Sequence, residues 1–420
     1  MNILNTRQRI STAQFQKKKL RLPILFILIT VVLDAMGIGL IVPVMPALIQ
    51  EIQGGTLATA ALWGGVLSTI FAVMQFLFGP FLGALSDSIG RKPVLVVSLV
   101  IMSIDYLVMA IAQSIWLLLI VRIIGGITAA SGATAGAYIA DISKPEDKAA
   151  NFGLLGAGFG IGFVLGPLVG GLLGELGTRA PFYAAAALSA FNAIFGYIIL
   201  KETVTKRIIR KFSWARANPF GAFLHMTRLP GIAWLLIVYF IYSVAFYVYP
   251  AIWAYFTQER FGWTPQTIGI SLALFGITMA IVQGVLIRLI LRWVGERMTV
   301  VYGHLFDMVA FFLIALVSNG TVALILTPFA ALGAVITPAL QGLMSKIISD
   351  DAQGELQGML VSIHALAMIT APMIMTWIFA FFTQPMAPIY LPGAPFLFSL
   401  ILMALSLFVF LRYQFIRSER

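Results

Sequence analysis

The sequence predicts an all-α membrane protein with about twelve transmembrane helices in two pseudo-symmetric six-helix bundles. Three observations support this prediction. Of the 420 residues, 60% are hydrophobic and only 10% are charged, which leaves too little polar surface for a soluble globule. Apolar stretches of about 20 residues or more, the length that crosses a bilayer, follow one another along the chain. The longest polar segment, residues 201–230, divides these stretches into two equal groups.

In the first group, the apolar stretches are delimited by charge clusters and by Gly/Pro turns. A basic segment, residues 1–21, precedes the first stretch, which is far longer than the core of a cleavable signal peptide. The loop between the third and fourth stretches consists only of Ala112, Gln113 and Ser114. The expected helix cores of this bundle, which occupies residues 22–200, are 22–50, 57–85, 93–112, 115–140, 150–175 and 181–200.

The second group follows the polar segment 201–230, which is expected to be a cytoplasmic loop. Its helix cores, within a bundle of residues 231–412, are expected at 231–256, 264–292, 298–317, 321–348, 356–382 and 393–412. Residues 413–420 form a tail. A weak repeat relates the halves, because the sequence around Gly83–Lys92 after the second span is similar to Arg288–Arg297 after the eighth.

Lysine and arginine set the orientation. If the N-terminus is cytoplasmic, every Lys and Arg except Arg122, Arg179 and Arg260 falls in an inner loop or tail. The positive-inside rule therefore predicts a multi-pass membrane protein with both termini in the cytoplasm. Topology accounts for the net charge of +11, so a nucleic-acid partner is not required.

Three aspartates, Asp34, Asp105 and Asp307, lie near the middle of spans that contain no other formally charged residue. A charged side chain at that depth costs roughly 2.5 to 3.5 kcal/mol on insertion scales, so it normally marks a proton or substrate path. The aspartates are therefore predicted to carry coupled protons in a transporter. A non-transport receptor would have no need of them, and a nutrient symporter stays open as an alternative.

Other chemistries have little support in the sequence. There is no cysteine, and no His/Asp/Glu group has metal-ligand spacing. No phosphate-binding loop indicates use of ATP. The prediction is a secondary transporter rather than an enzyme, with no bound cofactor, driven by a proton gradient and functional as a monomer in the lipid bilayer.

Two glycine patterns are candidates for moving parts. The loop after the second span contains Gly83, Ser86, Asp87, Gly90 and Arg91. Asp87 is expected to pair with Arg91 or with the start of the eleventh span, where Ser349 and Asp350 are cap candidates; a plain topogenic turn is the alternative. In the fifth span, Gly158, Gly162, Gly166 and Gly170 recur every four residues, next to Pro167 and Gly171. Such a stripe is either a packing surface or part of a transport motif.

Two further side chains in the spans have open roles. Arg122, in the fourth span, needs a carboxylate, a wet cavity or a route to the interface. His304 lies three residues before Asp307, and it either hydrogen-bonds near the coupling site or points toward the cytoplasm.

These patterns resemble a known family. The Gly83–Lys92 loop resembles the signature of the major facilitator superfamily, and residues 162–171 resemble the antiporter motif of its drug exporters. Residues 33–46, 103–107, 256–263, 338–345 and 353–362 are similar to the bacterial tetracycline/proton antiporters. The resemblance implies proton-coupled export of a hydrophobic or amphiphilic compound across a bacterial inner membrane, with a role for Arg122 in proton transfer.

The resemblance is weaker where it concerns substrate. Met279 stands where the best-known members carry a histidine, and an aromatic run that includes Phe246, Tyr247 and Tyr249 replaces glutamines. A central cavity lined by that run and by Gln341 is expected to bind the substrate. A tetracycline, with or without a divalent cation, is the leading substrate; another drug, a metabolite or a siderophore is the alternative.

Overall fold

The computed structural model describes residues 23–129, 131–144, 146–204, 212–214, 217–221, 231–349 and 352–418. Within these ranges the regular secondary structure is helical, without strands. Eleven helical runs are long and apolar enough to cross a membrane. The basic segment 1–21 and most of the central polar segment lie outside the described residues.

The first six spans agree with the predicted cores. The first runs from Pro23 to Gln53 and is interrupted by the 3₁₀ turn η1 (Val42–Val44) at Pro43. The remaining elements are α2 (Met45–Gln53), α3 (Leu57–Ile89), α4 (Arg91–Ile111), α5 (Ile115–Thr128), α6 (Ser131–Ile142), α7 (Lys148–Gly174) and α8 (Ala180–Ile199). The fourth predicted helix is therefore two helices, α5 and α6.

The second group contains more interruptions. Its elements are α10 (Ala233–Phe246), α11 (Val248–Phe261), α12 (Pro265–Ile281), η3 (Val282–Leu286), α13 (Ile287–Leu316), α14 (Gly320–Ala330), η4 (Ala331–Val335), α15 (Ile336–Ser345), α16 (Gln353–Thr383) and α17 (Ala394–Ser418). The run Pro265–Leu316 has 52 residues, and Gly295 inside it has φ of 77°, outside the helical region. The run therefore holds two spans, which explains why the structure has eleven helical runs where the sequence predicts twelve crossings.

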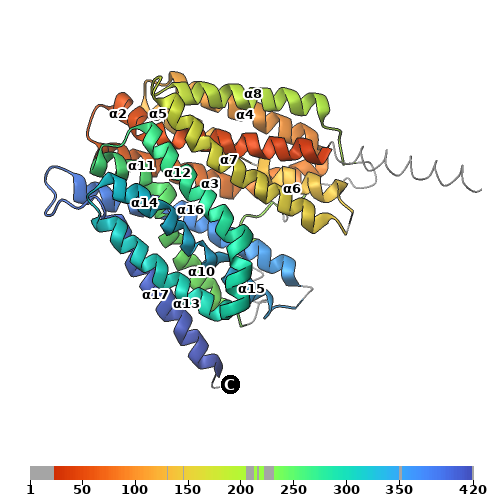
Figure 1. Ribbon diagram of the computed structural model, residues 1–420. Coiled ribbons are helices and arrows are strands. Elements are labelled where there is room, and N and C mark those ends of the chain that lie inside the picture. Colours follow the sequence, from red (N-terminus) through yellow and green to blue (C-terminus); the bar gives the residue numbers. More distant parts are fainter. Residues whose placement is uncertain are drawn as a thin grey trace, which may run out of the picture.

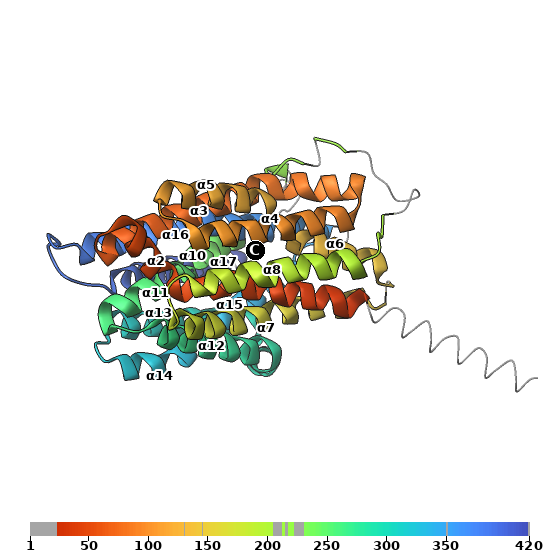
Figure 2. The ribbon, with the colours of Figure 1, turned by 90° about the horizontal axis from the view of Figure 1, so that it is seen from above.

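The helices pack in two groups. In the first, α4 packs against α8 and α3 packs against α5; in the second, α17 packs against α10 and α13. Two extensive helix–helix contacts join the groups: α3 packs against α16, and α7 packs against α12. Figure 1 shows the groups close together near α2, α11 and α14, with α8 and α17 diverging away from that end. Figure 2 shows α3 beside α16 and α7 beside α12 in the view from above.

Glycines show where the groups meet. A Cβ on Gly171 would come within 2.5 Å of the Pro265 carbonyl oxygen, and a Cβ on Gly65 would overlap the Thr376 side chain. The Thr69 hydroxyl donates a hydrogen bond of 3.1 Å to the Ile369 carbonyl. These contacts lie on the side of the molecule away from the C-terminus. Toward the other end of α3 and α16, the positions of Gly83, Gly354 and Gly358 have open space. The two groups are therefore joined at one end and separated at the other.

Candidate functional site

Asp105 and Arg122 form a buried ion pair. Asp105 lies in α4 and is 4% exposed, and Arg122 lies in α5 and is 8% exposed. The Arg122 guanidinium donates a hydrogen bond to the Asp105 carboxylate and lies 5.1 Å from the centre of the Phe71 ring. The short loop between α4 and α5 brings the two helices side by side. Arg122 is thus satisfied by a carboxylate and does not extend to the membrane interface.

Asp34 belongs to the same neighbourhood. It lies in the first span and is half-buried. Both Asp34 and Asp105 are within electrostatic range of the buried Tyr106 phenol. The Tyr106 ring packs against Gly37, one turn after Asp34, where a Cβ would be 3.4 Å from the ring. The structure therefore brings Asp34, Asp105 and Arg122 together around Tyr106.

Asp307 has a different environment. It lies in α13 and is fully buried. Neither carboxyl oxygen has a hydrogen-bond or ion-pair partner among the described residues. Tyr242 and Tyr249 are within electrostatic range of it. Taking an uncompensated carboxylate out of water is costly, so this environment favours the neutral acid.

His304, one turn before Asp307, is fully buried. Its Nδ1 lies 2.8 Å from the Val300 carbonyl oxygen, and its Nε2 lies 2.9 Å from Ser406 Oγ in α17. Since a carbonyl can only accept, Nδ1 carries a proton. The ring is also 6.0 Å from the Tyr242 ring. The side chain therefore joins α13 to α17 inside the second group of helices and does not point toward the interface.

The loop after α3 forms a charged cluster. Arg91 Nη1 lies 2.5 Å from Asp87 Oδ1 and donates a 2.7 Å hydrogen bond to Ser86 Oγ, while Nε lies 3.2 Å from Asp141 Oδ2. Gly90 has φ of 116°, which other residues rarely adopt. Asp87 thus pairs with Arg91, one of its two predicted partners. Of the two residues predicted to cap the eleventh span, Ser349 lies within the described residues and Asp350 lies outside them.

Glu202, just beyond α8, completes this cluster and was not predicted. Its carboxylate accepts hydrogen bonds from the backbone N–H groups of Arg91 at 2.9 Å and Lys92 at 3.1 Å. These N–H groups begin α4, where the helix dipole favours an anion. A Cβ on Gly90 would overlap the same carboxylate. No sequence signal near residue 90 points to a residue 112 positions away, so only the fold reveals this contact.

The glycine stripe of α7 is a packing surface. Gly158, Gly162, Gly166 and Gly170 face the first span, where Cβ atoms would meet Leu28, Val32, Met36 and Leu40. Gly171 and the carbonyl of Pro167 instead face α12. Helix α7 therefore packs against the first span of its own group through one face and against α12 of the second group through another.

The residues predicted to line a substrate cavity lie in or beside an aromatic cluster of the second group. The Tyr249 ring lies 4.9 Å from that of Phe275, and the Phe246 ring lies 5.7 Å from that of Tyr242. Tyr247 separates α10 from α11. The Gln341 side chain lies beside the Tyr239 phenol. Tyr249 is buried, whereas Phe246, Tyr247 and Gln341 are half-buried.

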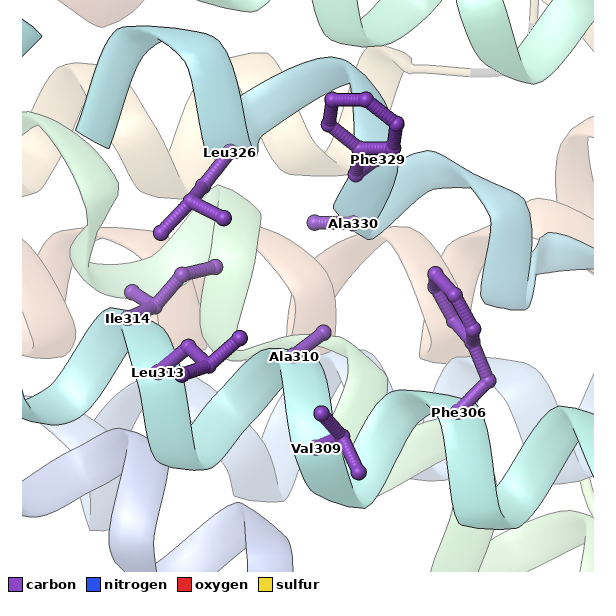
Figure 3. Close-up of a pocket in the computed structure, with 8 residues that line it drawn as sticks. All are labelled: Phe306, Val309, Ala310, Leu313, Ile314, Leu326, Phe329 and Ala330. Carbon is purple, nitrogen blue, oxygen red and sulfur yellow. The ribbon is translucent and has the colours of Figure 1, made fainter. Parts of the chain in front are cut away.

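A separate apolar groove of about 340 Å³ lies between α13 and α14. Figure 3 shows its eight lining side chains, none of which is polar. They are Phe306, Val309, Ala310, Leu313, Ile314, Leu326, Phe329 and Ala330. Val309 and Phe329 are exposed, so the groove opens on the outer apolar surface of the helices.

Among the described residues there are eleven long apolar runs, one of which holds two spans. Together with buried intramembrane charges and two joined helical groups, they are typical of a multi-pass membrane transporter. The family model of the Major Facilitator Superfamily matches residues 27–333 and, in a second match, 235–419. The class C tetracycline resistance protein of Escherichia coli is 42% identical over 85% of this chain and 89% of its own length. The class G protein of Vibrio anguillarum is 38% identical over 82% and 87%. The chain belongs to the major facilitator superfamily and, within it, to the family of these tetracycline resistance proteins.

The fold agrees with that assignment. The crystal structure of a bacterial homologue of the human lysosomal transporter Spinster, in an inward-facing conformation, matches with a TM-score of 0.78. The match covers 95% of this chain and 98% of that one at 17% identity, which shows the shared fold. The protein is therefore a transporter of the superfamily and not an enzyme.

Proposed function

We propose that the chain is a proton-coupled antiporter that exports a small hydrophobic or amphiphilic compound, with a tetracycline as the leading substrate. The observation that carries the mechanism is Asp307, a fully buried carboxyl group without a partner among the described residues. Such a group is stable in the membrane as the neutral acid and ionises when water reaches it. Alternating exposure therefore loads and releases a proton.

Support for tetracycline comes from the tetracycline resistance proteins, of which the class C protein is 42% identical to this chain. In the proposed cycle, Asp307 exchanges the proton, and the cluster of Asp34, Asp105 and Arg122 forms a second coupling centre. A divalent cation accompanies the substrate when the substrate is a chelating tetracycline. The aromatic residues Phe246, Tyr247 and Tyr249, together with Gln341, contact the substrate once the second group of helices moves.

The proposed setting is a bacterial inner membrane, with both termini in the cytoplasm and a monomer as the working unit. The bundles of residues 22–200 and 231–412 are the moving bodies, and residues 201–230 connect them. In this orientation the joined end faces outward. The cluster of Gly83, Ser86, Asp87, Gly90 and Arg91 is the cytoplasmic gate, and the antiporter motif of α7 transmits motion between the bodies.

The test is a transport assay in everted membrane vesicles energised with a proton gradient. Tetracycline, with and without Mg²⁺, and unrelated hydrophobic dyes are compared side by side. We expect tetracycline uptake coupled to proton efflux from the vesicles. Uptake of dyes but not of tetracycline would identify another drug as the substrate. Movement of substrate and protons in the same direction would indicate a symporter and overturn the antiport mechanism.

The role of Asp307 has its own test. Asp307→Asn keeps the size and hydrogen-bonding capacity of the side chain but cannot cycle a proton. We expect the variant to fold normally, to lose gradient-driven accumulation, and to retain downhill exchange of substrate. Substrate-induced proton release is measured in liposomes at matched protein amounts. Wild-type proton release by Asp307→Asn would contradict the assignment.

A further inference from the structure

The carboxyl group of Asp307 occupies space that only a glycine leaves free. An ideal Cβ placed on Gly333 would overlap the Asp307 carboxyl oxygens and carbon. Gly333 lies in η4, and both residues are buried. Since every other residue type has a Cβ, position 333 decides whether the carboxyl group can lie at this place between α13 and η4.

The backbone around Gly333 is interrupted in the middle of a span. η4 is a 3₁₀ turn between α14 and α15, and Pro328 and Pro338 lie five residues before and after Gly333. Prolines lack the N–H that an α-helix needs, so neither Leu324 nor Ala334 can receive the α-helical hydrogen bond from the residue four positions later. A 3₁₀ stretch inside a helix often marks a hinge.

A related contact occurs in the first group of helices. A Cβ on Gly125 of α5 would lie 2.7 Å from Asp105 Oδ1. Asp105 lies six residues before the end of α4, and Gly125 lies ten residues after the start of α5. Asp307 lies nine residues before the end of α13, and Gly333 lies thirteen residues after the start of α14. Both residues of the second pair are thus three residues deeper in the equivalent helix hairpin, so each aspartate meets its glycine in the same register between the two helices.

The two contacts differ in charge compensation. Arg122 lies three residues before Gly125, and the residue three before Gly333 is Ala330. The first carboxylate therefore has a cation beside its glycine, whereas Asp307 lies within electrostatic range of the uncharged phenols of Tyr242 and Tyr249. The second hairpin keeps the geometry of the first without its arginine.

We infer that Gly333 is a positioning residue for proton coupling: its missing side chain, within the 3₁₀ turn, makes a socket that holds the Asp307 carboxyl group away from water. The inference rests on the proposed role of Asp307. In the socket the group is the neutral acid. Movement of η4 opens the socket, the carboxyl group meets water, and its proton passes to a water molecule to leave the carboxylate and hydronium.

The test compares Gly333→Ala with Gly358→Ala, a control in α16 where a Cβ would meet nothing within 4 Å. Two quantities are measured on full-length protein at matched amounts of folded, monodisperse material. The first is labelling of Asp307 by a water-soluble carbodiimide, quantified by mass spectrometry. The second is the pH dependence of coupled transport in liposomes.

We expect Gly333→Ala to increase labelling of Asp307 by roughly tenfold or more, because misplacement of about 1 Å is enough for large effects at a reacting group. The pH of half-maximal transport should shift by about one unit, a tenfold change in proton concentration. Gly358→Ala should leave both quantities unchanged. In an Asp307→Asn background, Gly333→Ala should cause no further change in the pH dependence of exchange.

Two failures are distinguishable. Wild-type labelling and pH dependence in folded Gly333→Ala would overturn the socket while leaving the role of Asp307 intact. Normal coupling in Asp307→Asn would instead overturn the proposed function, whatever Gly333→Ala does. If Gly333→Ala does not fold, the double variant Gly333→Ala/Asp307→Ala tests the steric origin, because Asp307→Ala removes the carboxyl group that a Cβ at position 333 would overlap. A folding defect equal in the Asp307 and Asp307→Ala backgrounds would also contradict the socket.

Discussion

At the scale of single residues, the buried carboxylates fall into two kinds. Asp105 is compensated by Arg122, whereas Asp307 has no partner among the described side chains. A compensated pair keeps both charges until a movement of the helices separates them, while an uncompensated acid responds to water directly. We therefore expect distinct tasks for aspartates that are alike in the sequence.

The Asp105–Arg122 pair gives a stability prediction. Arg122→Gln leaves the Asp105 charge buried and unpaired, and breaking a buried pair from one side costs about 3 to 5 kcal/mol. The double variant Asp105→Asn/Arg122→Gln removes both charges and should recover most of that loss. The free energy of unfolding in detergent is the measurement. Equal destabilisation of the single and double variants would show that the pair contributes nothing through its charge.

The sequence identifies these charges but not their arrangement. Each aspartate is visible because it interrupts an apolar stretch, and Arg122 is visible for the same reason. Their pairing depends on the contact between α4 and α5, and the contact of Asp307 with Gly333 depends on how η4 passes α13. Glu202 was missed because it looks like one more charge in a polar segment.

At the scale of elements, hydropathy predicted the number of crossings better than their internal shape. Long apolar stretches predict spans because few other structures bury so much apolar surface. Interruptions at Tyr247, Ala129 and η4 leave the hydropathy unchanged, so the sequence predicted continuous helices there. The charges around Gly295 predict a break between two spans, and the helical run of α12, η3 and α13 is kinked at Gly295, where the backbone is not helical.

Helix α7 gives a prediction with a matched control in the same element. A Cβ on Gly166 would lie 2.7 Å from the Met36 carbonyl oxygen, whereas a Cβ on Gly160 would meet nothing within 4 Å. Gly166→Ala should therefore separate α7 from the first span and destabilise the fold by about 1 to 3 kcal/mol. Gly160→Ala should be neutral or slightly stabilising. Thermal unfolding of the two purified variants compares them, and similar melting temperatures would contradict the packing role of the stripe.

At the scale of the whole molecule, the two groups of helices touch through α3 with α16 and α7 with α12 and separate toward the C-terminal end. Glycines such as Gly65, Gly171 and Gly269 lie at the contacts between the groups, which lets the backbones approach closely there. An interface of this kind can part and re-form, as alternating access requires. The conformation is thus one state of a cycle in which the joined end must open.

Cross-linking tests that cycle directly, because the chain contains no cysteine of its own. The Thr69 hydroxyl and the Ile369 carbonyl are 3.1 Å apart across α3 and α16. Thr69→Cys/Ile369→Cys should therefore be joined by a short bifunctional thiol reagent, which holds the joined end closed. We expect transport in liposomes to fall by about tenfold or more on cross-linking, and to return when a cleavable reagent is reduced. Each single-cysteine variant, treated identically, controls for modification alone. A cross-linked protein that transports at the wild-type rate would show that α3 and α16 stay together throughout the cycle, and that the joined end opens elsewhere.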